Sequence, residues 1–159
     1  MSGELSAVHG EIIDLVVFTV DSVICALRVD EVHEIKRLVH ITRVHRSAGY
    51  VRGVVNLRGE IVTLIDLCSK LNYRIGELCD NSRMVVVKKG SEQIGLLVDT
   101  IEDAVSARNE DILAPPSTIR GAEGRFFKGV YKTPDALIAV LDMEALLEKD
   151  GNDVSLSSE

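Results

Sequence analysis

Residues 53–71 read GVVNLRGEIVTLIDLCSKL, and this stretch decides the fold because the chain contains a second version of it. The second version, GVYKTPDALIAVLDMEALL, spans residues 129–147, and its strand LIAVL aligns with IVTLI without a gap. Asp66 and Asp142 close these two strands at matching positions. Apolar strands can resemble one another by chance, but an ungapped run with shared aspartates favours a duplicated structural unit.

A second pair of similar segments lies upstream of the two copies. Residues 26–35 read ALRVDEVHEI and residues 95–104 read GLLVDTIEDA, so that Val29–Asp30 matches Val98–Asp99. The two segments follow the same order in both halves of the chain. We therefore expect one β unit that is used twice.

Short apolar runs on either side of turn residues predict β-hairpins in both halves. Asp21–Ser22 divides one pair of runs, and Lys88–Ser91 divides another. Asp66 and Asp142 each precede a short helical stretch, where an aspartate caps the first helical turn and contributes ~1 kcal/mol. We prefer this structural role for both aspartates to a catalytic one.

The composition limits the classes of protein to which the chain can belong. Of its 159 residues, 46% are hydrophobic and only 4% are aromatic, so the core must be built from Val, Ile and Leu, and the β-branched residues among them favour strands. The formal net charge of −7 argues against nucleic-acid binding, because an acidic protein does not attract phosphate backbones. No apolar run approaches the ~20 residues of a membrane span, and the N-terminus lacks a signal-peptide pattern. We expect a cytoplasmic protein with no direct membrane insertion.

Residues that carry catalytic or metal chemistry are few and scattered. The four histidines lack metal-ligand spacing, and no phosphate-binding or nucleophile-elbow motif is present. Cys25, Cys68 and Cys79 lie far apart without a CxxC, so we interpret them as buried or incidental thiols. We therefore expect no metal, no cofactor and no enzymatic activity. An enzyme with an unrecognised site is the rival hypothesis, and it would need converging acids or histidines.

The turn Asn56–Leu57–Arg58–Gly59 lies between two β segments. Glycine supplies a positive φ and asparagine bonds nearby backbone, so the turn explains both of these residues. The turn does not require Arg58, whose guanidinium presents five donors in a rigid fork. Two interpretations stay open: Arg58 holds its own lobe together through an internal ion pair, or it meets a partner at the cleft between two lobes.

Residues 50–62, YVRGVVNLRGEIV, followed by Ile65–Asp66–Leu67, closely resemble the signature of the CheW family. Residues 26–35 and 94–99 resemble two weaker recurrent stretches of the same family, and the likeness runs from about Leu15 to Leu147. The resemblance implies an all-β fold with two five-stranded SH3-like β-barrels around a shared aliphatic core, and short helices after the barrel strands. It agrees with the duplication seen in the sequence.

This resemblance also implies a single CheW-like domain over residues 12–150, made of two lobes. The first lobe is expected mainly in residues 15–80 and the second mainly in residues 83–141, and an exchange of terminal segments between the lobes is left open. Residues 151–159 are rich in serine and acidic residues, so we predict a disordered tail.

The function that the resemblance implies is that of an adaptor, which couples chemoreceptors to the histidine kinase CheA in bacterial chemotaxis. Its expected partners are the regulatory domain of CheA and the cytoplasmic tip of the receptors. An adaptor in a related pathway, such as pilus-based motility, is the alternative. By position, the partner-binding residues are Arg58, Asn56, Glu34, Val32, Val98, Met84 and Arg83. Val32 and Val98 are expected to floor an apolar groove, with Arg58 and Glu34 at its rim.

Three positions depart from the usual pattern of the family. Ala48 and Thr63 stand where proline is usual, and Cys68 stands where arginine is usual. Loss of proline loosens a turn or a strand edge without changing the fold. Loss of the arginine removes a charge that could meet a partner. Together the departures favour a specialised paralogue.

Overall fold

The computed structural model describes residues 10–38, 40–44 and 49–148, and nearly all of its regular structure is β. The strands are β1 (Ile12–Val20), β2 (Val23–Arg28), β3 (Val32–Arg37), β4 (Val51–Leu57), β5 (Glu60–Asp66), β6 (Arg83–Lys89), β7 (Glu92–Val98), β8 (Thr100–Ile101), β9 (Val105–Arg108), β10 (Thr118–Ile119), β11 (Ala122–Glu123), β12 (Phe127–Lys132) and β13 (Leu137–Leu141). The short helices are α2 (Leu67–Lys70) and α3 (Met143–Leu147), with single 3₁₀ turns η1 (Val29–Glu31), η2 (Asn109–Asp111) and η3 (Gly124–Phe126). No helix within these ranges has the length and hydropathy of a membrane-spanning segment.

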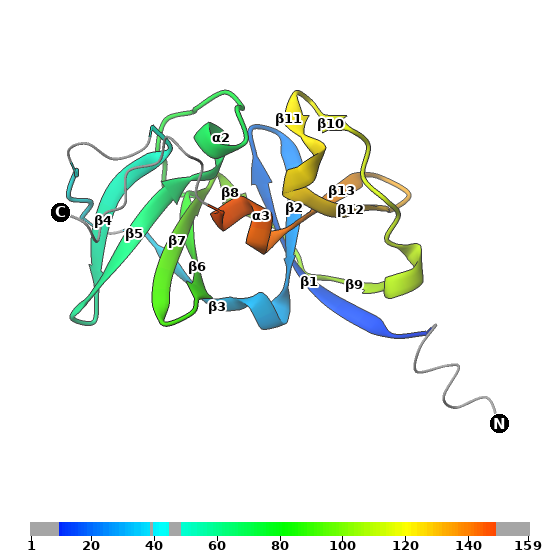
Figure 1. The fold of residues 1–159 in the computed structure, drawn as a ribbon, viewed down its shortest axis with the longest axis horizontal. Coiled ribbons are helices and arrows are strands. Elements are labelled where there is room, and N and C mark those ends of the chain that lie inside the picture. The colour runs from blue at the N-terminus through cyan, green and yellow to red at the C-terminus, as the bar shows by residue number, and fades with distance from the viewer. Residues whose placement is uncertain (1–9, 39, 45–48, 149–159) are drawn as a thin grey trace.

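The strands form two SH3-like barrels that lie side by side (Figure 1). Barrel 1 is the five-stranded sheet with the order β3-β6-β7-β5-β4. Barrel 2 is the sheet β12-β13-β2-β1-β8, in which β9 also pairs with β1. The small hairpin β10–β11 and the helices α2 and α3 lie over the boundary between the barrels, which we call the seam. The predicted all-β fold of two barrels is confirmed.

The strand registers show that the two barrels are copies of one unit. Strand β5 runs parallel to β7 with Leu64 opposite Gly95, and β13 runs parallel to β2 with Val140 opposite Ala26. Leu64 aligns with Val140 in the repeat, so their strand partners, Gly95 and Ala26, occupy equivalent positions in the two barrels. The sequence alignment matches the same two residues. A register shift occurs at Gly53 in barrel 1 and at its counterpart in barrel 2. The predicted duplication is therefore confirmed strand by strand.

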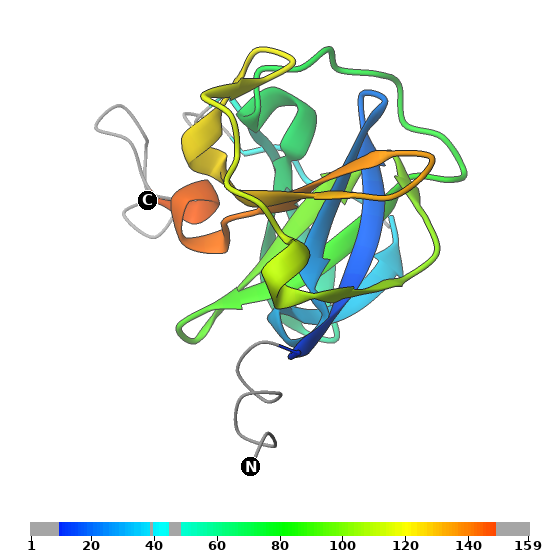
Figure 2. The ribbon, with the colours of Figure 1, turned by 90° about the vertical axis from the view of Figure 1, so that its right-hand side faces the viewer.

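The strand exchange corrects the predicted boundary between the lobes. The hairpin β6–β7, residues 83–98, belongs to barrel 1, although the sequence assigned it to the second lobe. The N-terminal hairpin β1–β2 belongs to barrel 2, where β2 lies beside β13 (Figure 2). Barrel 1 is therefore one continuous stretch, residues 32–98, whereas barrel 2 combines the hairpin β1–β2 from before that stretch with β8, β9, β12 and β13 from after it. The predicted tail, residues 151–159, lies outside the described residues.

Three clusters of buried side chains fill the molecule. Barrel 1 and barrel 2 each have an aliphatic interior, built around Leu64 and Val86 in one and around Leu15 and Val140 in the other. The third and largest cluster lies at the seam and takes residues from both barrels. It is mostly aliphatic, as predicted, but it also holds all three phenylalanines of the chain: Phe18, Phe126 and Phe127.

Polar contacts also connect the barrels at the seam. The Tyr73 hydroxyl donates to the backbone oxygen of Ile119 at 2.6 Å, and Lys89 Nζ donates to the backbone oxygen of Leu147 at 2.8 Å. The Asp21 amide donates to an Asp99 carboxylate oxygen at 2.8 Å. These hydrogen bonds supplement the buried seam cluster and fix the barrels relative to one another.

Both predicted helix caps are present. The carboxylate of Asp66 accepts hydrogen bonds from the amides of Cys68 and Ser69 at the start of α2, and Asp142 accepts from the amide of Ala145 in α3. Asp66 also lies 3.3 Å from the guanidinium of Arg52. Because these contacts satisfy the first turn of each helix, the two repeated aspartates are structural.

Candidate functional site

Arg58 occupies a tight turn between β4 and β5. Arg58 and Gly59 both have positive φ values, 52° and 85°, which is the signature of a two-residue type I′ hairpin. The Asn56 side-chain oxygen accepts a hydrogen bond from the Gly59 amide at 2.9 Å. The turn therefore uses Asn56 and Gly59 as the sequence predicted, and it holds Arg58 in a conformation that an arginine adopts at some cost.

The Arg58 guanidinium forms a forked ion pair with the Glu34 carboxylate on β3. Nη1 lies 3.2 Å from Oε1, and Nη2 bonds Oε2. This hydrogen bond lowers the pKa of Glu34 below its usual value and raises that of Arg58. The internal ion pair that the sequence left open is thus present, within barrel 1. The Arg58 side chain is still 60% exposed, so its outer face can meet another molecule.

The turn that carries Arg58 is not at the seam. It lies at the end of the β4–β5 hairpin, on the side of barrel 1 that faces away from barrel 2 (Figure 1). The expectation that Arg58 and Glu34 rim a groove between the lobes is therefore corrected. The two residues belong to the outer surface of barrel 1.

Two of the predicted partner-binding residues are interior. Val98 has an exposed fraction of 0% and packs in the seam cluster, and Met84 has 1% and packs inside barrel 1. The prediction that their side chains contact a partner is wrong, because the alternating pattern of a strand does not show which of two buried faces a residue occupies. Val32 is half-buried and packs against the seam cluster.

Arg83 is half-buried at the start of β6. Its guanidinium donates to the backbone oxygens of Asp80 and Ser82, at 2.6 and 2.9 Å. It lines a hollow of about 310 Å³ together with residues of β8, including Ile101. Of the seven predicted residues, the structure therefore brings Arg58, Asn56 and Glu34 together and places Arg83 at a separate hollow.

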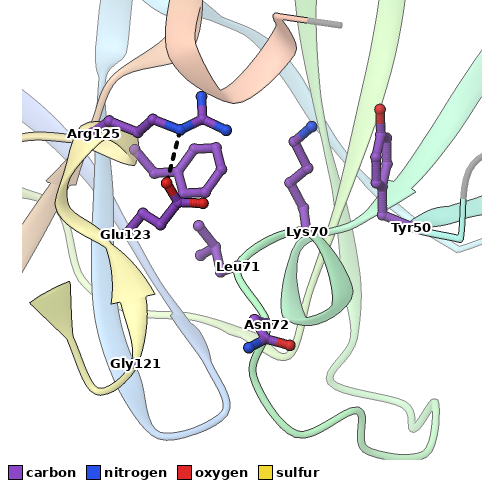
Figure 3. Close-up of a pocket in the computed structure, with 8 residues that line it drawn as sticks. Tyr50, Lys70, Leu71, Asn72, Gly121, Glu123 and Arg125 are labelled. Carbon is purple, nitrogen blue, oxygen red and sulfur yellow. Dashed lines mark hydrogen bonds and ion pairs between the residues drawn. The ribbon is translucent and has the colours of Figure 1, made fainter. Parts of the chain in front are cut away.

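A pocket that the sequence did not predict lies at the seam (Figure 3). We call it the seam pocket; its volume is about 240 Å³. Tyr50 and Lys70 come from the segments that flank the β4–β5 hairpin of barrel 1, and Glu123, Arg125 and Phe126 come from the segment that leads into β12 of barrel 2. A lysine at the end of a short helix is usually solvated, so the sequence offered no reason to place Lys70 in a pocket. The one available signal was its alignment with Leu146 in the other repeat.

Cys25 and Cys68 are buried in the seam cluster, and Cys79 is exposed. Burial, followed by the nearby Asp99 charge, raises the pKa of Cys68 to about 12, and burial also raises that of Cys25 to about 12. A hydrogen bond from the backbone of Asn81 lowers the pKa of Cys79, which is exposed. Within the described ranges, no cluster of three or more His, Cys, Asp or Glu residues has the arrangement of a metal site.

We predict that a disulfide reagent at neutral pH modifies Cys79 in the folded chain and leaves Cys25 and Cys68 unmodified, because only thiolates attack and only Cys79 is accessible. Counting the released chromophore before and after unfolding measures this. The Cys79→Ser variant is the control and should show almost no reaction until it unfolds. Rapid modification of that folded variant would contradict the burial of the other two thiols.

Comparison with known proteins identifies the family. A family model described as the CheW-like domain matches residues 14–151. The chain belongs to the CheW family. It is similar to the chemotaxis protein CheW of Bacillus subtilis (strain 168), with 27% identity over 138 residues that cover 87% of this chain and 88% of that protein. The chemotaxis protein CheW of Helicobacter pylori is 28% identical over 140 residues, which cover 88% of this chain and 84% of that protein.

A solved CheW structure has the same fold. The crystal structure of the scaffolding protein TtCheW from Thermoanaerobacter tengcongensis superposes with a TM-score of 0.82 at 27% identity, covering 89% of this chain and 92% of that one. The family predicted from the sequence is confirmed, and it is a family of chemotaxis scaffolds.

The family departures can now be placed in the fold. Cys68 is only 3% exposed, and its Sγ lies 3.9 Å from an Asp99 carboxylate oxygen. Position 68 therefore lies beside acidic groups of this chain. Thr63 lies in the middle of β5, paired with Val54. Ala48 lies outside the described residues.

Proposed function

We propose that the chain is a non-enzymatic CheW adaptor that couples chemoreceptors to the histidine kinase CheA in bacterial chemotaxis. The observation that carries the proposal is the match to the CheW family over residues 14–151, which includes both barrels and the seam. The proposed partners are the regulatory domain of CheA and the cytoplasmic tip of the receptors. The proposed location is the cytoplasm, at receptor arrays on the inner face of the membrane.

The surface around Arg58 supports a binding role for barrel 1. Ile61, three residues after Arg58, is 63% exposed, and Ile35, next to Glu34, is 38% exposed. Removal of apolar surface from water contributes ~25 cal/mol per Å², less the cost of ordering the partners. A forked ion pair among exposed apolar side chains adds orientation to such an interface. We propose that this outer face of barrel 1 is one partner surface.

Edge strands give the proposal a second support. Strand β3 is at one edge of its sheet, and among the described strands it pairs with β6 alone. An unpaired edge with alternating exposed side chains can accept a strand or a sheet from another protein. Glu34 and Ile35 are both on this strand, next to the Arg58 turn.

We predict that Arg58→Glu reduces kinase activation in reconstituted receptor arrays while the chain stays folded, because the variant sets two carboxylates against each other and removes the exposed guanidinium. The measurement is phosphorylation by CheA with receptors present, together with circular dichroism of the variant. Arg108→Glu, a change of the same charge on an exposed residue of barrel 2, is the matched control.

A charge swap separates the two roles of Arg58. The double variant Glu34→Arg/Arg58→Glu restores an internal ion pair with the charges exchanged. We expect kinase activation to stay low in this variant if the guanidinium itself meets a partner. Normal activation by the folded single variant Arg58→Glu would remove this surface from the proposed function.

A further inference from the structure

Lys70 is a largely buried lysine whose ammonium group borders a pocket and has no anionic partner among the described residues. It has an exposed fraction of only 8%. Among the described residues, no hydrogen-bond acceptor or carboxylate pairs with its ammonium group, and its contacts are with aromatic rings. Nζ lies 4.0 Å from the centroid of the Tyr50 ring and 5.9 Å from that of Phe126. A lysine this buried ordinarily pairs with an acid, and contact with aromatic faces offsets only part of the cost of desolvation.

The repeat shows that the fold does not need a lysine at this position. Lys70 aligns with Leu146, which is 1% exposed and packs in the seam cluster. The two aromatic neighbours also align: Tyr50 and Phe126 each accept, through the backbone oxygen, a 2.8 Å hydrogen bond from the amide of the capping aspartate that follows. Both repeats thus keep the aromatic residue and the cap, and only one of them has a cation. The charge of Lys70 is therefore not required by the architecture.

The charges around the seam pocket favour an anion. Arg125 stacks on the Phe126 ring, with Cζ 4.3 Å from the centroid, and its Nε lies 3.1 Å from the Glu123 carboxylate. Lys70 and Arg125 together carry two positive charges against the one negative charge of Glu123. The described lining residues therefore carry one net positive charge, in a chain whose net charge is −7. Figure 3 shows Lys70 beside Tyr50 on one wall, with Arg125 and Glu123 on the other.

The size of the pocket favours a small anionic group. Its volume of about 240 Å³ is below the range of pockets that hold drug-sized ligands or cofactors, which begin at about 300 Å³. The carboxylate of a short side chain is small enough for this pocket, which is lined by the Lys70 ammonium group and the rings of Tyr50 and Phe126. Because the two walls come from different barrels, such a side chain would contact both.

We propose that the seam pocket binds the carboxylate of an aspartate or glutamate side chain on a protein partner, with Lys70 as the cation that pairs with it. The choice of a protein as the source of the carboxylate rests on the proposed adaptor function. Lys70 then supplies specificity, since a neutral side chain at the same point of the partner would leave the ammonium buried and unpaired.

The test uses the full chain and the variant Lys70→Met, which removes the charge and keeps a long, flexible side chain against the two rings. Titration against the CheA regulatory domain and against a receptor tip, both from the same organism, gives two affinities. We expect Lys70→Met to weaken binding to one of the two partners by ~10-fold, the effect of losing one charge-assisted hydrogen bond. The melting temperature should not fall, since a buried charge has been replaced by an apolar group. Lys132→Met, which removes an exposed charge from barrel 2, should leave both affinities unchanged.

The outcomes separate this proposal from the adaptor function. If Lys70→Met binds both partners as tightly as the unmodified chain does, the carboxylate proposal is overturned and the adaptor function stands. If the unmodified chain binds neither partner, the adaptor function is overturned, and the protein carboxylate with it. Titrations with sodium acetate and inorganic phosphate, followed by NMR of the lysine side chains, form the third arm. Competition between acetate and the partner supports the proposal, whereas phosphate binding at Lys70 with unchanged partner affinities would make the pocket a free-anion site.

Discussion

The variant Phe18→Ala should lose ~4 kcal/mol of unfolding free energy, the cost typical of removing a fully buried phenylalanine. Phe18 has an exposed fraction of 0% and is the largest fully buried side chain of the described residues. It lies on β1 in barrel 2 but packs in the seam cluster, which also takes residues from barrel 1. We therefore expect the variant to destabilise both barrels together. Urea unfolding followed by circular dichroism measures the loss.

Amide hydrogen exchange tests whether the barrels unfold as one unit. Exchange should accelerate by a similar factor in the β4–β5 hairpin of barrel 1 and the β12–β13 hairpin of barrel 2. Leu137→Ala is the control, because Leu137 is 45% exposed and its truncation should cost little. Faster exchange in the β12–β13 hairpin alone would show that the seam cluster does not couple the barrels.

Gly53→Ala should lower the unfolding free energy by ~3 kcal/mol, because the added methyl group combines steric overlap with backbone strain. Gly53 has a φ of +148°, and a Cβ at this position would lie 2.2 Å from the backbone oxygen of Thr42. That oxygen accepts a hydrogen bond from the Val54 amide at 2.8 Å, so the methyl group would push Thr42 away from the edge of β4. Thermal and urea unfolding measure the loss.

Two other glycines provide matched controls for Gly53→Ala. A Cβ at Gly76 or at Gly59 would have no atom within 4 Å. Gly76→Ala should therefore leave stability unchanged, and Gly59→Ala should cost ~1 kcal/mol from its positive φ alone. If Gly53→Ala is no more destabilising than Gly59→Ala, the contact with Thr42 is not a constraint on the fold.

Local sequence signals were sufficient for much of the fold. The turn at Asp21–Ser22, where both residues have positive φ, and the caps at Asp66 and Asp142 follow from the chemistry of single residues and their neighbours. The repeat also predicted the correct register, because duplicated strands keep their partners. The family followed from the long motif around Arg58, residues 50–62.

Contacts between distant segments could not be predicted in the same way. The strands of barrel 1 bury both faces, one inside the barrel and one at the seam, so hydrophobicity alone placed neither Met84 nor Val98 correctly. The Arg58–Glu34 pair joins residues on different strands, and its presence could be named only as one of two alternatives. The polar composition of region 108–128 does not indicate the β10–β11 hairpin or the two 3₁₀ turns that it contains, and the hydrogen bond from the Tyr73 hydroxyl to Ile119 links this hairpin to a segment distant in sequence.

The exchange of hairpins determines the order in which the two barrels can close during synthesis. On the ribosome, all strands of barrel 1 emerge as one continuous stretch, so this half can close while synthesis is still under way. The hairpin β1–β2 emerges before barrel 1, but β2 can pair with its parallel neighbour β13, where Ala26 lies opposite Val140, only after β13 has emerged. Until then, the apolar face of the β1–β2 hairpin is not packed against the rest of barrel 2. The hairpin β1–β2 is therefore exposed to aggregation until β13 has been added.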